Sequence, residues 1–184
     1  MKQESTAKYV LRLTLTLLLI ASVVAAALAM VNQITKPIIL AAQQEKTQKA
    51  IMQVLPGGYE TEITTFSDST KLVSKVYKGA NGYAVEVTPS GFDGTITMMV
   101  GVDFDGKVLG ISIISQSETA GLGAVSAAST SAGLAFRAQF VGLSGQVAVT
   151  KDGGTIDAIT SATVTSRAIC VGVSAALACV VGLQ

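Results

Sequence analysis

The sequence predicts an α+β protein: an N-terminal transmembrane helix, and behind it a single domain in which an antiparallel sheet is flanked by helices. Three observations predict this fold. An uncharged run of 23 residues lies near the N-terminus, at positions 13–35. Between residues 71 and 115, short segments rich in Val and Ile alternate with glycine-containing turns, as antiparallel strands do. Segments rich in Ala and other small residues follow, and no repeat or low-complexity linker divides the domain.

The uncharged run 13–35 is long enough to cross a hydrocarbon layer of about 30 Å at about 1.5 Å per residue. Three basic residues lie within the first 12 positions, whereas Lys36 alone follows the run closely. By the positive-inside rule we expect a cytoplasmic N-terminus, a single pass through the cell (inner) membrane, and the folded domain on the extracytoplasmic side. The competing interpretation is a cleaved signal peptide, because Ala27-Leu-Ala29 fits a small-x-small processing site after a basic segment. Cleavage after Ala29 would release a secreted ligand-binding protein.

Pro37 is expected to end or kink the span, because proline removes a helix hydrogen bond. Residues 38–55 have helical spacing and predict a juxtamembrane helix that stops at the Pro56-Gly57-Gly58 break. The predicted parts are residues 1–36 (cytoplasmic N-terminus and transmembrane helix), 37–58 (juxtamembrane helix and linker) and 59–184 (the folded domain).

Four antiparallel strands are expected, over residues 71–78, 82–88, 95–104 and 107–115. Asp105-Gly106 lies between the last two strands and predicts a hairpin with a type I′ turn, because that turn needs positive φ angles.

Helices and one more strand are expected after the hairpin. Residues 124–140 are rich in Ala and Ser and end in Phe136 and Phe140, which share a helix face and would pack on the sheet. Residues 146–150 predict a further strand. The stretch 168–183 is uncharged but short and poor in large aliphatic residues, so the helix from residue 163 onward is interpreted as buried rather than as a second span.

Composition excludes several classes of function. The 184 residues contain no histidine, which excludes a Ser-His-Asp triad, a histidine-ligated haem and the usual zinc site. Cys170 and Cys179 are too few for an iron-sulfur cluster, and on a helix their spacing places them on opposite faces, so they cannot pair with each other. Because the helix is rich in Ala, Val and Gly, we interpret both cysteines as small buried apolar residues. The first 50 residues carry six basic and two acidic side chains, and the remainder seven and ten. This distribution fits a membrane-anchored domain and argues against nucleic-acid binding.

A cluster of hydroxyl side chains marks the expected start of the last helix. It follows a single carboxylate, and its sequence is Asp157-Ala-Ile-Thr160-Ser161-Ala162-Thr163-Val-Thr165-Ser166. On composition alone these hydroxyls would cap the free amides of the helix. A helix N-terminus also favours a phosphate, and Arg167, four residues after Thr163, would share a face with it. The two interpretations are compatible.

Two other segments are candidates for ligand contact. Ser117-Glu118-Thr119-Ala120-Gly121-Leu122-Gly123 lies between a predicted strand and a predicted helix, where glycines allow close backbone approach. It does not fit a dinucleotide-binding loop, because the third small residue and an adjoining βαβ unit are missing. Ser90-Gly91-Phe92-Asp93-Gly94 is a turn whose phenyl ring could line a flat ring system. Taken alone, each segment reads as an ordinary loop or hairpin end.

Six segments, taken in order, carry a family resemblance: Gly82-Tyr-Ala-Val-Glu-Val, Gly91-Phe-Asp-Gly-Thr-Ile, Met99-Val-Gly-Val-Asp, Asp105-Gly-Lys-Val-Leu-Gly, Glu118-Thr-Ala-Gly-Leu-Gly and Asp157-Ala-Ile-Thr-Ser-Ala-Thr. Over about residues 70–170 the chain resembles the FMN-binding domain shared by the G subunit of Rnf electron-transport complexes and the C subunit of sodium-pumping NADH:quinone reductase. The last segment resembles the Asp-x-x-(Ser/Thr)-Gly-Ala-Thr signature at which a flavin transferase esterifies FMN to the final threonine. The short chain is more similar to the Rnf G subunit.

The resemblance implies a covalent flavoprotein that carries electrons within an Rnf-type complex, without independent catalysis. The whole complex would couple electron transfer between ferredoxin and NAD to Na⁺ or H⁺ translocation, and its partners would be the other integral-membrane and peripheral subunits, with a flavin transferase for maturation. The implied FMN site comprises Thr163 (covalent FMN), Asp157 (read by the transferase), Ser161 and Ala162 (within the attachment motif), Thr160, Thr165, Ser166 and Arg167 (around the phosphate), and Glu118, Thr119, Gly121, Leu122 and Phe92 (near the ring or ribityl chain).

Three positions depart from the family pattern. Ser161 stands where the family usually has Gly, Ala120 where it usually has Pro, and Gln116 or Ser117 where it has a histidine. If the motif turn needs a positive φ, Ser161 would be strained by roughly 1 kcal/mol or more. The changes at Ser161 and Ala120 leave open a cofactor-free, membrane-tethered adaptor with the same fold. The C-type subunit of a Na⁺-translocating NADH:quinone reductase is a second alternative, because the resemblance includes that subunit.

Overall fold

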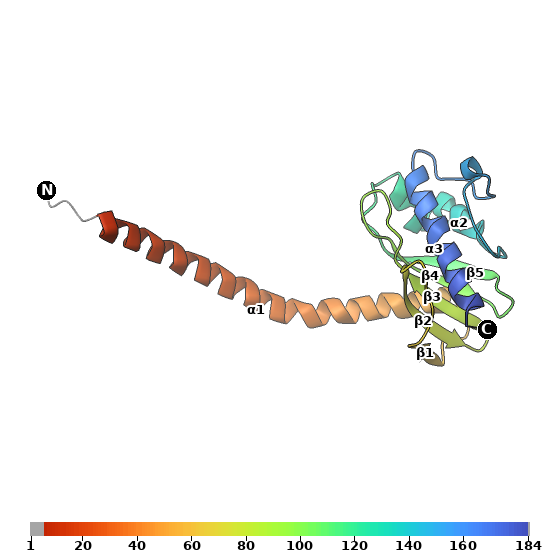
Figure 1. Cartoon of the computed structure of the whole chain (residues 1–184), viewed down its shortest axis with the longest axis horizontal. Helices are drawn as coiled ribbons and strands as arrows, with labels where there is room; N and C mark the ends of the chain where they lie inside the picture. The colour runs from red at the N-terminus through yellow and green to blue at the C-terminus, as the bar shows by residue number, and fades with distance from the viewer. Residues whose placement is uncertain (1–5, 184) are drawn as a thin grey trace. The chain divides into compact units, whose positions relative to one another are not determined.

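The computed structural model describes residues 6–183, which belong to two compact units, Met1–Glu45 and Lys46–Gln184. Helix α1 (Thr6–Val54) contains Pro37 within its length, so Pro37 does not end the span. Proline removes one backbone hydrogen bond, and the turns before and after it keep theirs. The helix bends in this part of its course (Figure 1). The predicted juxtamembrane helix is thus the continuation of α1.

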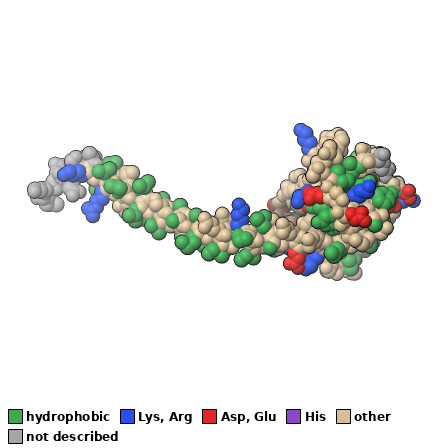
Figure 2. Space-filling view, turned by 90° about the horizontal axis from the view of Figure 1, so that it is seen from below, with side chains coloured by type: hydrophobic (Ala, Val, Ile, Leu, Met, Phe, Trp, Pro, Cys, Tyr) green, Lys and Arg blue, Asp and Glu red, His purple; other side chains and the backbone are tan. Residues whose placement is uncertain are grey.

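The first part of α1 presents large apolar side chains to its surroundings. Leu17, Leu19, Leu28 and Met30 are each at least 65% exposed, and Figure 2 shows apolar side chains along this helix. Two of the described helices, α1 and α3 (Thr163–Val181), are long and apolar enough to cross a membrane. Two thirds of the apolar window of α3 is buried within the domain, which confirms its interpretation as a buried helix.

The domain contains a five-stranded antiparallel sheet in which each strand pairs with its neighbour in sequence. The strands are β1 (Thr61–Ile63), β2 (Val73–Gly79), β3 (Gly82–Val87), β4 (Thr97–Val102) and β5 (Val108–Ser115). The four predicted strands correspond to β2–β5, and the predicted α+β class is confirmed. β1 was not predicted, since a segment of three residues is too short to show alternation.

The hairpin between β4 and β5 has a different turn from the one predicted. Asp103 N donates to Lys107 O over 2.9 Å, and Gly106, at φ +77°, has the positive angle. Asp105 has no positive φ, so the type I′ prediction is wrong. The reason is the Asp103 carboxylate, whose Oδ1 accepts hydrogen bonds from the amides of Asp105 (3.0 Å) and Lys107 (2.7 Å) and stabilises a longer loop.

Helices cover both faces of the sheet. On one face, α3 packs on β2, β3 and β4, and Val85, Val100, Ile169 and Val173 belong to the main core there (Figure 1). On the other face, the last turns of α1 form a second cluster: Ala50, Ile51, Val54 and Leu55 with Tyr77, Ala84 and Met99. A Cβ at Gly101 would lie 2.1 Å from Val54 O, so glycine permits this close packing of helix on strand.

The predicted helix over 124–140 is divided into a 3₁₀ helix, η1 (Gly123–Ala127), and α2 (Ser131–Ala138). Ala128 and Thr130 are extended between them, and Thr130 Oγ1 accepts a hydrogen bond from Gly133 N, which caps α2. The predicted aromatic pair is confirmed, because the rings of Phe136 and Phe140 meet edge to face at 5.4 Å and both are buried.

Two predictions near the C-terminal half have opposite outcomes. The predicted strand over 146–150 is wrong: Val147 N donates to Ser174 Oγ on α3, and only Val149 forms a bridge, to Ile156, before η2 (Thr150–Asp152). Cys170 and Cys179 are buried free thiols, as predicted, and burial raises the pKa of Cys170 to about 11.

Candidate functional site

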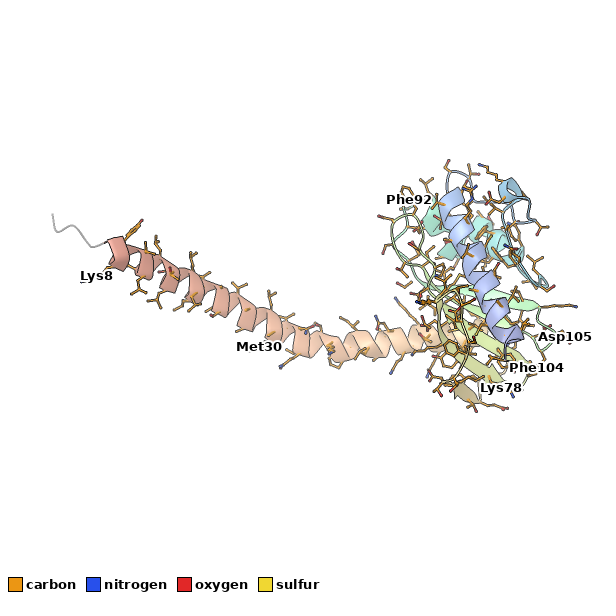
Figure 3. The ribbon with its side chains drawn as sticks, in the orientation of Figure 1. Lys8, Met30, Lys78, Phe92, Phe104 and Asp105 are labelled. Atoms are coloured by element: carbon orange, nitrogen blue, oxygen red, sulfur yellow. The ribbon has the colours of Figure 1, made fainter. Side chains whose placement is uncertain are left out.

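A pocket of about 300 Å³ lies between three segments that are distant in sequence: the loop 90–95, the segment 118–123 and the start of α3. Figure 3 shows Phe92 at the outer edge of the domain, at the end where α3 begins. The lining residues are Phe92, Glu118, Thr119, Leu122, Gly123, Ser161, Ala162, Thr163, Val164 and Thr165. The fold therefore unites the three segments that the sequence singled out.

The Glu118 side chain joins these segments. It is 7% exposed, its Oε1 accepts a hydrogen bond from Asp93 N (3.0 Å), and its Oε2 accepts one from Thr165 Oγ1. Two glycines make room for the carboxylate, since a Cβ at Gly91 would lie 2.4 Å from Oε1 and a Cβ at Gly123 would lie 2.7 Å from Oε2. A buried carboxylate with its hydrogen-bond partners in place is the arrangement that burial of a charged group requires.

Helix α3 begins without a side-chain cap, so the capping interpretation of the hydroxyl cluster is wrong. The residue before the helix is Ala162, with φ −130° and ψ 41°. Instead, Ser166 Oγ accepts a hydrogen bond from Ile159 N and donates to Ala162 O, each over 3.0 Å. The Ser166 hydroxyl thus stabilises the turn that leads into α3, and the first amides of the helix keep their donors available.

The hydroxyls of the cluster differ in access. Thr165 and Ser166 are buried and hydrogen-bonded, at 1% and 0% exposure. Thr163, the first residue of α3, is half-buried and lines the pocket, and within residues 6–183 its side chain has no hydrogen bond. Ser161 is exposed and also lines the pocket. Thr160 is exposed but does not line the pocket, so Thr163 and Ser161 are the hydroxyl residues of the cluster that are both accessible and part of the pocket lining.

Ser161 has φ +60°, in the left-handed region that favours glycine. We expect Ser161→Gly to raise the free energy of unfolding by up to about 1 kcal/mol, since glycine removes the Cβ strain at some cost in chain entropy. Ser161→Ala is the matched control: it removes the same hydroxyl, keeps the Cβ, and should give no gain. Thermal unfolding of the two variants measures this. Equal stabilities would show that Ser161 is not strained.

Five of the predicted site residues do not line the pocket: Asp157, Thr160, Ser166, Gly121 and Arg167. Asp157 is exposed, and its backbone N–H donates to Gln139 Oε1 over 2.7 Å. Thr160 is exposed, Ser166 lies beneath the turn, and Gly121, at φ +77°, shapes the loop behind Leu122.

Arg167 also lies outside the pocket lining. Its Nε and Nη2 donate to the two carboxylate oxygens of Asp152, each over 2.6 Å, on the exposed surface. The hydrogen bond lowers the pKa of Asp152 and raises the pKa of Arg167. The guanidinium is thus engaged in an ion pair, although it lies one turn after Thr163.

Sequence reasoning missed Gly123 and Val164 as lining residues, and Gly91 as a neighbour of Glu118. Gly91 and Gly123 belong to segments that the sequence analysis did single out. The signal that could have found them is the need for a glycine wherever a buried side chain passes close to the backbone.

The pocket fits a flavin phosphate and its ring system. Its lining includes the start of α3, which has no side-chain cap, and backbone amides and the helix dipole favour a phosphate at such a helix end. Its rim carries exposed apolar groups, with Phe92 at 71%, Val164 at 47% and Leu122 at 39% exposure. An aromatic and aliphatic rim above an anion-binding helix end matches a ligand that has a flat ring at one end and a phosphate at the other.

Two family models match the chain. The model of the FMN-binding domain matches residues 91–178, which include every lining residue of the pocket. The model described as the RnfG N-terminal region matches residues 1–54, which end where α1 ends.

Known proteins similar to this chain come from archaea and bacteria. The G subunit of an ion-translocating oxidoreductase complex from Methanosarcina acetivorans is 32% identical over 176 residues, covering 90% of this chain and 91% of the relative. The G subunit of the Na(+)-translocating ferredoxin:NAD(+) oxidoreductase complex from Acetobacterium woodii is 32% identical over 191 residues, covering 91% and 89%. The G subunit of an ion-translocating oxidoreductase complex from Pseudomonas aeruginosa is 31% identical over 191 residues, covering 94% and 89%.

Proposed function

Because the chain belongs to the family of G subunits of Rnf-type ion-translocating oxidoreductase complexes, as an FMN-binding electron-transfer subunit, we propose that it holds one FMN covalently, as a phosphoester of Thr163. Written from FMN, the Oγ1–H bond of Thr163 and one P–OH bond of the flavin phosphate would break, an Oγ1–P bond would form, and one water would leave. The net addition to the chain is FMN less one water.

The observation that carries this proposal is the access of Thr163. Thr163 lines the pocket as the first residue of α3, whereas the neighbouring Thr165 and Ser166 hydroxyls are buried and hydrogen-bonded. A phosphate bonded to Thr163 would lie beside the free amides of the helix start, where its negative charge is favoured. The exposed residues Thr160 and Ser161 precede the helix and lack that advantage, and Thr160 does not line the pocket.

Bound FMN would supply the redox chemistry, and the residues of the chain bind and orient it. Phe92, Leu122 and Val164 offer apolar contacts for the ring at the pocket rim, and Thr119 offers a hydroxyl in the same wall. Thr165 and Glu118 hold the inner wall by their mutual hydrogen bond. A covalent tether prevents loss of the cofactor into dilute surroundings, which suits a domain outside the cell.

The finer assignments of the proposal concern the assembly and its membrane. The N-terminus would lie in the cytoplasm and the flavin domain on the extracytoplasmic side, in agreement with the basic residues before the span. A flavin transferase would attach the cofactor. The complex would couple ferredoxin and NAD electron transfer to Na⁺ or H⁺ translocation, as the name of the Acetobacterium relative describes for that protein with sodium.

The intact mass of the unfolded protein tests the proposal. The full chain is produced together with a flavin transferase, purified from membranes and denatured before mass spectrometry. We expect an added mass of FMN less one water, with absorbance near 450 nm that remains with the denatured chain. A chain of unmodified mass, from cells in which another flavoprotein is modified by the same transferase, would contradict covalent attachment.

The alternatives have less support. A C-type subunit of a Na⁺-translocating NADH:quinone reductase would share the domain, but the relatives reported above are G subunits of the other complex. A cofactor-free adaptor would not need an apolar-rimmed pocket at a free helix end. A secreted protein would require cleavage after Ala29. This site lies within the segment that matches the RnfG N-terminal region and within α1, whose last turns cover the sheet.

A further inference from the structure

The loop that carries Phe92 has few anchors of its own. This loop, residues 90–95 and here called the Phe92 loop, is closed by a bridge between Ser90 and Thr95 and by a hydrogen bond from Gly91 N to Gly94 O over 2.7 Å. The Phe92 ring is 71% exposed, and none of the ring pairs found among the described residues includes it. The ring is therefore placed by the backbone of its loop rather than by packing around it.

A buried side chain, that of Glu118, forms a hydrogen bond with the backbone of the Phe92 loop. Asp93 N, next to Phe92, donates to Glu118 Oε1, and Glu118 Oε2 accepts from Thr165 Oγ1 in the first turn of α3. One carboxylate thus links the loop to the helix at whose first residue Thr163 lies. Hydrogen bonds to a charged, buried acceptor are stronger than neutral ones.

We propose that Glu118 is a positioning residue: its buried carboxylate ties the Phe92 loop to the first turn of α3 and fixes the aromatic wall against which the flavin ring lies. The part that concerns the flavin rests on the proposed function, whereas the tie between loop and helix does not. Gly91 and Gly123 belong to the same device, because a Cβ at either position would collide with the carboxylate.

Hydrogen exchange of the Asp93 amide tests the tie without reference to the flavin. In the full-length protein in detergent, we expect this amide to exchange at least about tenfold faster in Glu118→Ala than in the wild type, because its charged acceptor is gone. Glu118→Gln keeps a carbonyl oxygen as acceptor and should restore most of the protection. Glu86→Ala is the matched control, since Glu86 is a half-buried carboxylate on β3 that does not line the pocket.

Visible circular dichroism of the attached flavin tests the consequence for the ring, because the signal depends on how the ring is held. Glu118→Ala should lose most of this signal in a chain that has Phe92, and should change it little in a Phe92→Ala background. A residue that acts through Phe92 has no further effect once Phe92 is absent, whereas a direct effect of the charge on the flavin would persist in both backgrounds.

Several outcomes would overturn the inference: an Asp93 amide equally protected in Glu118→Ala and wild type, an equal increase in exchange in Glu86→Ala, or an equal loss of dichroism in both Phe92 backgrounds. If Glu118→Ala does not fold, Thr165→Val removes only the helix half of the tie at nearly unchanged volume, and should reduce the dichroism. Intact mass on the same samples separates the two proposals. Unmodified mass contradicts covalent attachment alone, and modified mass with unchanged exchange contradicts the positioning role alone.

Discussion

Thr163→Ala abolishes the covalent flavin: we expect the variant, produced with a flavin transferase, to show unmodified mass and no yellow colour after denaturation. The reason is the loss of the hydroxyl oxygen that would form the bond to phosphorus. The fold should be retained, because Thr163 is half-buried at the first residue of α3 and its side chain has no hydrogen bond within residues 6–183. Electron transfer through the complex should then be lost, because no redox group remains on this subunit.

Two neighbouring variants control for a general disturbance of the site. Ser161→Ala removes the other hydroxyl of the cluster that belongs to an accessible, pocket-lining residue. Thr165→Val removes the hydroxyl of a residue that is 1% exposed and hydrogen-bonded to Glu118. Both should keep the added mass. Covalent flavin in Thr163→Ala would mean that another hydroxyl carries the bond. If Ser161→Ala also lacked covalent flavin, that hydroxyl would be the one of Ser161.

Ile51→Ala is expected to destabilise the domain by about 2–5 kcal/mol, although the residue belongs to the long N-terminal helix. Ile51 is 2% exposed and packs with Val54 and Leu55 against Tyr77, Ala84 and Met99 on the sheet. A smaller side chain leaves a cavity in this second cluster. Denaturant unfolding of the full-length protein in detergent, followed by a signal of the folded domain, measures the change.

Met52→Ala is the matched control for Ile51→Ala, because Met52 is the adjacent residue of the same helix and is 67% exposed. Its loss should change the free energy of unfolding by less than about 0.5 kcal/mol. Equal effects of the two variants would mean that the last turns of α1 do not form part of the domain core. A difference between the two variants would show that the last turns of α1 help to stabilise the sheet of the domain.

The strands of this fold could be predicted because their side chains alternate. In β3, Val85 belongs to the core under α3, while Ala84 belongs to the cluster under α1, and a shift by one residue would exchange these faces. The burial of α3 could be predicted for a different reason, since its uncharged stretch is short and consists largely of small apolar residues. Residue patterns do not specify particular side-chain hydrogen bonds. Such bonds are found at the turn after Asp103, at the start of α2 within residues 124–140, and at Val147 in the segment 146–150 that forms no strand.

The sequence by itself singled out the segments that line the pocket, since Phe92, Glu118 and the hydroxyls around Thr163 lie in motifs whose residue types suit a phosphate and a flat ring. Only the tertiary structure decided which of these side chains are accessible and which are held by hydrogen bonds. It buried Thr165 and Ser166, left Thr163 accessible, paired Arg167 with Asp152 and placed the Glu118 carboxylate between the Phe92 loop and α3. The physical reason is that access and hydrogen-bond partners depend on which distant segments pack together, whereas a motif specifies only local residue types and spacing.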